Sequence, residues 1–337
     1  MVQKRRHQEQ TEQVEKKAKK KYVVPIWLCL NILIWGSAFY LWSQERDAPP
    51  LRNPIFAANE IHFEARREAI IFNDEAVLSF SDVDVDILSD YAVLANLSTG
   101  EIIFDYRGSN RAYPASITKI MTVLVGLEYS TSDEVVVQFD LNELYLAGST
   151  MTGFMNGEIR TLSEILHGAM LTSGGDATAS LAHHVAGSYE DFVELMNATA
   201  RRLGMHNTHF MNTSGLHHVN HYTTARDTAI LLEYALNNRQ FERIFTAPTY
   251  TFTNSEGSQQ IMRSTMFRNL EEPIINGGEI LGGKVGFTTP AGLCLASFAT
   301  DGVYDFVLIT FSAPSGEVPP AHLQDAVNIY EYFFNFE

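Results

Sequence analysis

A chain of 337 residues, 45% of them hydrophobic, has room for one large domain or two small ones around a sizeable core. The net charge is −16, but the first 21 residues hold eight Lys/Arg and three Glu, whereas the remaining residues hold 16 Lys/Arg and 37 Asp/Glu. So acidic a main part argues against nucleic acid or an anionic lipid surface as its partner.

Residues 23–42 (VVPIWLCLNILIWGSAFYLW) carry no formal charge and have the length of a membrane-spanning helix, which needs about 20 apolar residues. Pro25 is tolerated in a first helical turn, and Trp27 and Trp42 suit the membrane interfaces. The alternatives are a buried core helix and a cleaved signal peptide, but the run is long for a signal peptide and no small-residue cleavage site follows it. Because the Lys/Arg excess lies before the run, we predict a single-pass anchor, a cytoplasmic tail of residues 1–22 and an exported remainder.

The two cysteines fit this arrangement. Cys29 lies within the predicted span and Cys294 stands alone in the exported part, so no disulfide can form within that part. No zinc-type cysteine spacing occurs either. The exported domain must therefore be stabilised by its core.

Histidines occur as two adjacent pairs and one neighbour, His183, His184, His217, His218 and His221. Adjacent residues on a helix point about 100° apart, so a single metal ion rarely binds both. No Cys or carboxylate spacing of a metal site accompanies them. We expect loop or surface histidines, with no bound metal.

Residues 43–87 are predicted to form a stalk and lead-in, since three prolines fall early among polar residues and the acidic stretch SDVDVD follows at 81–86. The main domain is expected over residues 88–337. It opens with two apolar runs, 91–97 and 101–106, which predict a β-hairpin around the turn residues Ser98-Thr99-Gly100.

Helical periodicity and strand-like runs follow in separate blocks. Apolar spacings of three and four predict helices over 116–129, 161–172, 174–186, 189–203 and 223–237. The strand-like runs TYTFTN, LGGKVGFT, LCLASFAT and YDFVLITFS come next, and a helix over about 320–334 closes the chain. This order predicts an α+β fold: an antiparallel sheet whose first and last strands meet, flanked by a helical block.

The stretch YPASITK, residues 113–119, places Ser116 three residues before Lys119, on one face of a helix. A serine hydroxyl is a weak nucleophile and needs a base within hydrogen-bond reach. A lysine can be that base when burial and a nearby cation depress its pKa. An isolated S-x-x-K is nevertheless most often an ordinary helix start.

Two further motifs follow in order, SGGDA at 173–177 and KVGFT at 284–288. Together the three resemble the signature of the serine penicillin-recognising enzymes. The segments 90–128, 212–236 and 282–300 are similar to the serine D-alanyl-D-alanine carboxypeptidases, the low-molecular-mass penicillin-binding proteins. The resemblance covers roughly residues 88–335 and implies the β-lactamase/DD-peptidase-like fold.

The resemblance also implies roles for individual residues. Ser116 would attack the carbonyl between two terminal D-alanines, Lys119 would take its proton, and Ser173 would relay a proton to the departing D-alanine. Backbone N–H groups of Ser116 and Phe287 would form the oxyanion hole. The substrate-binding positions would be Gly175, Lys284, Gly286, Phe287 and Thr288.

The activity implied by the resemblance is removal of the terminal D-alanine from peptidoglycan stem peptides through an acyl-enzyme. β-Lactams, which mimic the D-Ala-D-Ala terminus, would acylate the same serine. No metal or organic cofactor is needed. The expected location is a bacterial cell membrane, with the catalytic domain outside the cytoplasm.

The chain departs from the family pattern at three points. Gly175 stands where the family usually has Asn, and Val285 where it has Thr. No Lys or Arg follows Lys284, although many members bind the substrate carboxylate with an Arg near the last helix. His322 is the only cationisable side chain there, and we expect it to be a solvated residue at a helix start. Asp176 is expected to be a helix-capping residue.

These departures leave two alternatives to the enzyme. One is a catalytically impaired protein that keeps the fold and acts as a cell-wall binding or scaffold module. The other is a β-lactamase, which would need rapid deacylation, and no deacylating Glu motif of the class A type is present. The nucleophile and its base are retained, so the carboxypeptidase is the leading hypothesis.

Overall fold

The structure is a computed structural model that describes residues 72–73, 77–140, 148–270 and 272–335, all within one compact unit, Arg66–Glu337. The predicted tail, the predicted span and most of the predicted stalk lie outside the described residues. Among the residues that are described, none belongs to a helix with both the length and the apolar character needed to cross a bilayer.

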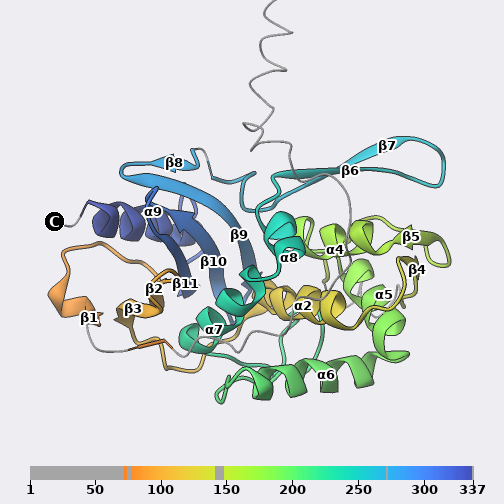
Figure 1. Cartoon of the computed structure of the whole chain (residues 1–337), viewed down its shortest axis with the longest axis horizontal. Helices are drawn as coiled ribbons and strands as arrows, with labels where there is room; N and C mark the ends of the chain where they lie inside the picture. The colour runs from red at the N-terminus through yellow and green to blue at the C-terminus, as the bar shows by residue number, and fades with distance from the viewer. Residues whose placement is uncertain (1–71, 74–76, 141–147, 271, 336–337) are drawn as a thin grey trace, which may run out of the picture. The chain divides into compact units, whose positions relative to one another are not determined.

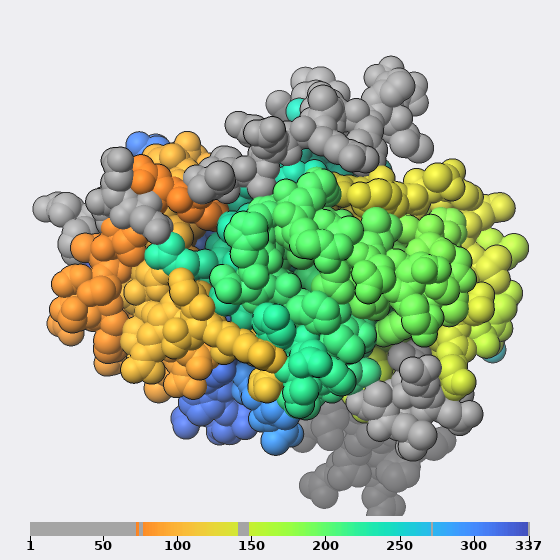
Figure 2. Space-filling model, turned by 90° about the horizontal axis from the view of Figure 1, so that it is seen from below, coloured from red at the N-terminus to blue at the C-terminus, as the bar shows by residue number. Residues whose placement is uncertain are grey.

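A seven-stranded sheet lies at the centre of this unit, with strand order β1-β3-β2-β11-β10-β9-β8 (Figure 1). Its strands are β1 Leu78–Ser79, β2 Tyr91–Asn96, β3 Glu101–Tyr106, β8 Ile274–Ile275, β9 Gly278–Thr288, β10 Gly292–Thr300 and β11 Asp305–Ala313. Neighbours are antiparallel, except that β1 runs parallel to β3. The predicted meeting of early and late strands is confirmed by the β2–β11 pair, and Figure 2 shows orange residues from the first described part of the chain close to blue residues from its last part.

The β2–β3 hairpin forms where the sequence predicts it. Gly100 closes the turn with a φ of 72°, a value that a glycine adopts without steric cost. The Asn96 side-chain oxygen accepts the N–H groups of Ser98 and Thr99. The turn chemistry read from the sequence is thus confirmed.

Side chains that alternate between the two faces of the sheet divide the hydrophobic core into two clusters. On β2, Ala92 and Leu94 belong to one buried cluster, and Val93 and Ala95 belong to the other. Successive side chains of a strand point to opposite faces, so each face of the sheet receives its own apolar layer. One layer packs against the last helix, and the other packs against the helical block.

Seven α-helices are described. Five of them match predicted helices within two residues, whereas the predicted helix 116–129 begins as an α-helix only at Lys119, since residues 115–118 form a 3₁₀ turn. The seven helices are α2 Lys119–Tyr129, α4 Leu162–Leu171, α5 Gly175–Ala186, α6 Tyr189–Arg202, α7 Ala225–Leu236, α8 Arg239–Phe245 and α9 Ala321–Phe334. The predicted final helix is α9. The short α8 was not predicted, because seven residues are too few for periodicity to be read.

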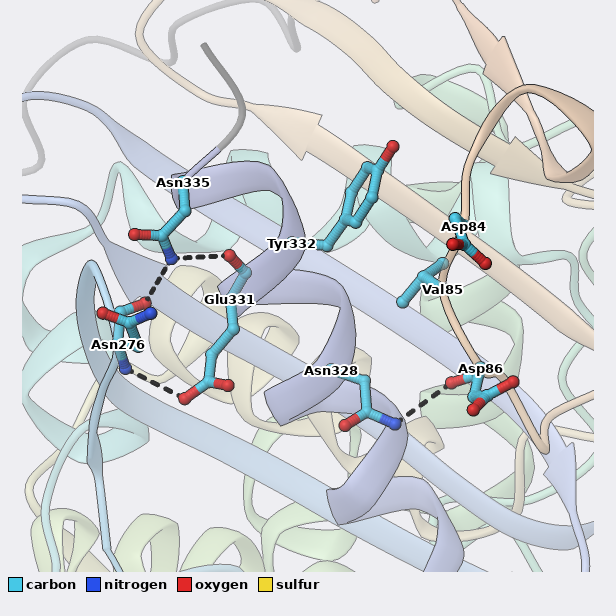
Figure 3. Close-up of a pocket in the computed structure, with 8 residues that line it drawn as sticks. All are labelled: Asp84, Val85, Asp86, Asn276, Asn328, Glu331, Tyr332 and Asn335. Atoms are coloured by element: carbon cyan, nitrogen blue, oxygen red, sulfur yellow. Dashed lines mark hydrogen bonds between the residues drawn. The ribbon is translucent and has the colours of Figure 1, made fainter.

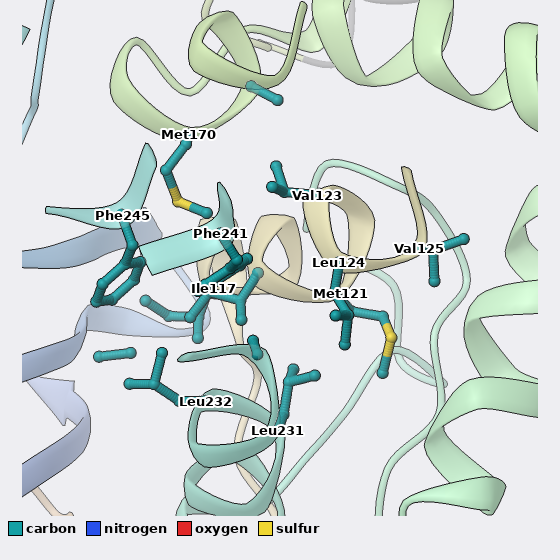
Figure 4. Close-up of a cluster of buried hydrophobic side chains, with 14 of the residues drawn as sticks. Ile117, Met121, Val123, Leu124, Val125, Met170, Leu231, Leu232, Phe241 and Phe245 are labelled. Carbon is teal, nitrogen blue, oxygen red and sulfur yellow. The ribbon is translucent and has the colours of Figure 1, made fainter. Parts of the chain in front are cut away.

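Helix α2 is the centre of the helical block. Its first eight residues are buried, and Figure 4 shows Met121 and Leu124 among apolar side chains of α7 and α8 such as Leu232 and Phe241. Burying one such side chain typically contributes about 1.5–3 kcal/mol. The helix that carries Lys119 is therefore held on all sides.

Two small two-stranded sheets lie outside the main sheet. They pair β4 Glu134–Val136 with β5 Ile159–Thr161, and β6 Thr249–Thr253 with β7 Gln259–Arg263. The strand β6 was predicted from TYTFTN. The strands β4, β5 and β7 were not predicted from the sequence.

A lead-in segment, residues 83–89, is fastened to α9. The Asp325 carboxylate accepts the N–H groups of Leu88 and Ser89 and the Ser89 hydroxyl. A groove of about 530 Å³ lies beside this segment (Figure 3). It is lined by Asp84, Val85, Asp86, Asn276, Asn328, Glu331, Tyr332 and Asn335, and none of these residues was predicted to serve the active site.

Candidate active site

Ser116 lies in a 3₁₀ turn, η2 (Ala115–Thr118), that leads directly into α2. Ala115 has a φ of 46°, a region that residues with a Cβ rarely adopt and that costs on the order of 1–3 kcal/mol. The carbonyl of Ala115 packs so closely on Gly215 that a Cβ on this glycine would overlap it. The strained conformation of Ala115, directly before Ser116, is therefore maintained by the loop around Gly215.

Lys119 begins α2 and is only 2% exposed. Its Nζ lies 3.2 Å from Oγ of Ser116 and 2.6 Å from the carbonyl oxygen of Ser214. Burial, and then the positive charge of Lys284, lower the Lys119 pKa well below its ordinary value, while Asp176 acts in the opposite direction. The neutral amine is thereby favoured, and it can accept the hydroxyl proton of Ser116.

A second pair joins the other two motifs. Lys284 lies on β9, is fully buried, and donates from Nζ to Oγ of Ser173 over 3.2 Å and to the carbonyl oxygen of Val285 over 3.0 Å. Burial lowers the Lys284 pKa to about 7. Ser173 itself has a φ of 62°, in the left-handed region. The structure therefore brings Ser173 and Lys284 together, beside Ser116 and Lys119.

Strand β9 passes directly against the serine turn. A Cβ placed on Gly286 would stand 2.9 Å from the backbone nitrogen of Ser116, closer than Cβ atoms normally approach. The absence of a side chain at Gly286 allows this approach. Phe287 follows with 52% of its surface exposed, and Thr288 ends the strand.

Gly175 begins α5, where its N–H donates to the carbonyl oxygen of Thr150 over 2.7 Å. The Thr150 hydroxyl donates in turn to the Ser173 carbonyl oxygen over 2.5 Å. The second motif is thus bound to Thr150 through its own backbone groups, the N–H of Gly175 and the carbonyl of Ser173. Val285, the other departure from the family pattern, packs partly buried against the core cluster on the α9 side of the sheet.

Asp176 was predicted to cap a helix, but it is not the N-cap of α5 and binds only one N–H of that helix, that of Ala177 at 2.9 Å. The N-cap of α5 is Gly174, which offers no side-chain cap. The buried Asp176 carboxylate instead accepts the N–H groups of Thr152, Gly153 and Phe154 at 2.8–3.0 Å. It joins α5 to the loop before α4.

Sequence reasoning missed Ser214, which gives Lys119 its shortest polar contact. The contact uses a backbone carbonyl, so no side-chain pattern could have indicated it. The available signal was the glycine that follows, because a φ of 86° at Gly215 marks a tight turn with no room for a side chain.

The clustered histidines have separate structural roles. His183 and His184 lie in the last turn of α5, and His217 and His218 are exposed. His221 lies in a loop, as expected, and it is only 2% exposed there. Within the described part of the chain, no group of three His, Cys, Asp or Glu residues could hold a metal ion.

The expectation for His322 is wrong. The side chain lies at the start of α9 but is only 4% exposed, and its Nδ1 has no hydrogen-bond partner. Burial lowers its pKa to about 4, because the charged ring would be poorly solvated. At neutral pH it therefore supplies no positive charge for a substrate carboxylate.

The profile of the D-alanyl-D-alanine carboxypeptidase family (Peptidase_S11) matches residues 78–315. The D-alanyl-D-alanine carboxypeptidase DacF of Bacillus subtilis (strain 168) is 30% identical over 226 residues, or 66% of this chain and 57% of that protein. A D-alanyl-D-alanine endopeptidase of Escherichia coli (strain K12) is 32% identical over 220 residues, or 62% of this chain and 66% of that protein. The chain thus spans only part of the length of these relatives.

Solved structures are similar to about three quarters of the chain. The crystal structure of the Streptomyces K15 DD-transpeptidase gives a TM-score of 0.67 at 26% identity, covering 75% of this chain and 99% of that one. A D-alanyl-D-alanine carboxypeptidase from Mycobacterium tuberculosis H37Rv, at 24% identity, shares the fold with a TM-score of 0.65 over 76% of this chain and 94% of that one. The site geometry, the fold and the family profile agree, and the chain belongs to the D-alanyl-D-alanine carboxypeptidase family.

Proposed function

We propose that the chain is a serine D-Ala-D-Ala carboxypeptidase that removes the terminal D-alanine from peptidoglycan stem peptides through an acyl-enzyme on Ser116. The observation that carries the proposal is the 3.2 Å between Nζ of buried Lys119 and Oγ of Ser116. A lysine whose pKa is lowered by burial and by a neighbouring cation can take the proton of an attacking hydroxyl.

In the acylation step, Oγ of Ser116 bonds to the carbonyl carbon between the two D-alanines while its proton moves to Nζ of Lys119. Negative charge then develops on the carbonyl oxygen, and the N–H groups of Ser116 and Phe287 are assigned to stabilise it. The close packing of Gly286 on the Ser116 nitrogen supports this assignment, since it leaves β9 beside that N–H.

Loss of D-alanine requires a proton on its departing nitrogen. Oγ of Ser173 is assigned to relay to this nitrogen the proton that Lys119 took from Ser116, so that Ser173 keeps a hydroxyl proton and Lys119 is neutral again when the C–N bond has broken. Lys284 contacts the same Oγ atom at 3.2 Å. Water then attacks the acyl ester on Ser116, and Lys119 is assigned to take a proton from the water and return it to Oγ of Ser116 as the ester C–O bond breaks and the shortened peptide leaves. Each step uses side chains of this chain and needs no cofactor.

Substrate binding is assigned to the end of β9. Thr288 would contact the terminal carboxylate, and Lys284 would add positive potential from its buried position. No Lys or Arg follows Lys284, and His322 is neutral near pH 7 because its pKa is about 4. We therefore expect the carboxylate to contribute less affinity here than a paired Arg would give, and the loss of the usual amide at Gly175 to lower the rate.

The test uses the full chain and its Ser116→Ala variant. Labelled penicillin should form one adduct on Ser116, and a pentapeptide ending in D-Ala-D-Ala should release D-alanine. The variant should do neither, because no nucleophile remains. Ser258→Ala, in the exposed turn between β6 and β7, is the matched control. A wild-type chain that forms no adduct and releases no D-alanine would reject the proposal.

We also propose a membrane-anchored arrangement in a bacterial cell: a cytoplasmic tail of residues 1–22, a span over 23–42, a stalk and lead-in over 43–87, and an extracytoplasmic domain over 88–337. The uncharged run and the preceding Lys/Arg excess support it. Protease treatment of intact spheroplasts should digest the domain from outside. A domain protected until the membrane is opened would contradict this orientation.

One observation favours a second function, binding of wall peptides without turnover: Gly175 has no side chain where the family usually has an amide. A binding module predicts that pentapeptide affinity is unchanged by Ser116→Ala and that the wild-type chain releases no D-alanine. The same experiment therefore decides between the two functions.

A further inference from the structure

The second partner of the catalytic lysine is a backbone group. Nζ of Lys119 donates to the carbonyl oxygen of Ser214 over 2.6 Å, a shorter distance than the 3.2 Å to Oγ of Ser116. A neutral amine has two N–H bonds and one lone pair. When one N–H is bound to a fixed acceptor, rotation about the terminal C–N bond is restricted and the lone pair can be aimed.

The side chain of Asn212 binds the backbone around the Ser214 carbonyl. The Asn212 side-chain oxygen accepts the N–H of Gly215 over 2.7 Å, and the N–H and hydroxyl of Ser214 over 3.2 and 3.4 Å. The Asn212 amide donates to the carbonyl oxygen of Leu216 over 2.8 Å. Asn212 therefore binds the turn on both sides of the carbonyl, and the hydroxyl of Tyr189 accepts the N–H of Thr213 over 3.1 Å.

The turn is also bound to the helix that carries the lysine. The Thr122 hydroxyl, one turn after Lys119 on α2, donates to the carbonyl oxygen of Thr213 over 2.7 Å. On the other side, Gly215 packs on the carbonyl of Ala115, next to the nucleophile. A movement of the turn would thus reach Lys119 and the strained Ala115 together.

We propose that Asn212 is a positioning residue: it fixes the Ser214 carbonyl, which binds one N–H of Lys119 and directs the amine lone pair at Oγ of Ser116. The inference rests on the proposed acyl-enzyme function. It also explains how Lys119 keeps a defined orientation although Gly175 supplies no side-chain amide. The base is oriented from the 212–216 turn.

Two variants of the full chain test this role through the pH dependence of acylation by labelled penicillin. Asn212→Ala removes the acceptor, so the plateau rate should fall about 10- to 100-fold, the usual cost of misplacing a catalytic group. The freed Lys119 loses a bond that favours its charged form, so the acidic limb of the profile should move to lower pH. Asn212→Asp keeps the acceptor and adds a negative charge, so it should retain most of the plateau and move the limb to higher pH.

The matched control is Asn254→Ala. Asn254 closes the exposed turn between β6 and β7 by accepting the N–H groups of Glu256 and Ser258 at 3.1 and 2.8 Å. Its loss should leave both rate and profile unchanged. A wild-type profile in Asn212→Ala, or an acidic limb displaced to higher pH in that variant, would overturn the positioning role. Thermal unfolding of each variant checks that the rates refer to folded protein.

A second probe separates this role from the proposed substrate. A small phosphonylating reagent needs an activated serine but no penicillin site, and its labelling of Ser116 should follow the same pH shifts in the two variants. Labelling by this reagent without penicillin acylation would reject the proposed function and still test Asn212. A wild-type chain that neither probe modifies would overturn both, because no oriented base would then exist.

Discussion

Two buried amines, those of Lys119 and Lys284, lie in the candidate active site and differ in what lowers their pKa values. Lys119 and Lys284 are 2% and 0% exposed, and neither has a carboxylate among its hydrogen-bond partners in the described residues. Desolvation disfavours the charge on both, and repulsion makes a second charge harder to hold than the first. The pKa of Lys119 is lowered by its neighbour as well as by burial, whereas burial alone lowers the pKa of Lys284. Asp176 raises the Lys119 pKa in turn, but the lowering by burial and by Lys284 is larger, so the neutral amine is favoured.

Replacing Lys284 by Met removes the neighbouring charge and keeps an unbranched side chain. The Lys119 pKa should rise, because the cation that lowers it is gone, and the acidic limb of the acylation profile should move to higher pH. The plateau should fall by about 10²–10³, as for other lost polarising groups. Lys284→Arg keeps the charge and should leave the limb in place, and a limb at the same pH in the Met variant would contradict this coupling.

Gly286→Ala tests the close approach of β9 to the serine turn. The added Cβ would stand 2.9 Å from the Ser116 nitrogen, so the turn or the strand must shift by several tenths of an ångström. We expect acylation to slow by about 100-fold, since small displacements of reacting groups cost that much. Gly302→Ala, in the turn between β10 and β11, meets nothing within 4 Å and should affect stability alone. Equal acylation rates for the two variants would refute the argument.

At the scale of elements, α5 is unusual because a glycine caps it and a buried carboxylate in its first turn faces outward to a loop. The Asp176 carboxylate joins the α5 start to residues 152–154, and these residues lie beside Thr150, which contacts both Ser173 and Gly175. The second motif is therefore positioned by a loop that Asp176 holds.

Asp176→Asn should loosen this loop. An amide replaces one acceptor oxygen by a donor that faces backbone N–H groups, and breaking such charge-assisted bonds costs about 1.5–3 kcal/mol each. We expect a loss of about 3 kcal/mol in unfolding free energy and faster hydrogen exchange at residues 152–154. Asp191→Asn is the control, because that exposed carboxylate accepts a bond from Ser188 at the start of α6. Unchanged exchange at 152–154 in the Asp176 variant would show that the carboxylate does not hold the loop.

The elements that could be predicted are those whose signal is local. The apolar periodicity of α2 and the Asn96–Gly100 turn depend on residues near one another in the chain, and both were predicted. The burial of Asp176 and of His322 was not predicted, because it depends on segments that come from elsewhere in the chain. The Ser214 contact was invisible for another reason: it is made by a peptide carbonyl, which every residue possesses.

At the scale of the whole molecule, two buried histidines make stability depend on pH. Burial lowers the pKa of His221 from 6.5 to about 3 and that of His322 from 6.5 to about 4. Below the ordinary value the unfolded chain therefore binds more protons than the folded one, and unfolding free energy falls as pH falls. Burial raises the pKa values of Asp227 and Asp325, which act in the opposite sense nearer pH 4.

Between about pH 6.5 and 5.5, each histidine should cost about 1 kcal/mol of unfolding free energy. Urea unfolding of the full chain at these two pH values measures the difference. His322→Leu should remove about half of it, because one of the two titrating groups is gone. His206→Gln changes an exposed histidine and should leave the difference as it is. A pH difference unaffected by His322→Leu would contradict the assignment.

The order of the strands in the sheet determines when the site can form as the chain is synthesised. Strand β2 is made early, but the neighbour that completes its pairing, β11, lies near the end of the chain, and Leu88 meets Asp325 across a separation of 237 residues. The strand that carries Lys284 joins β2 only through β10 and β11. Contacts this distant must wait for long-range loop closure. Until β9, β10 and β11 have been made, a growing chain therefore carries Ser116 and Lys119 without Lys284 and the strand that packs against them.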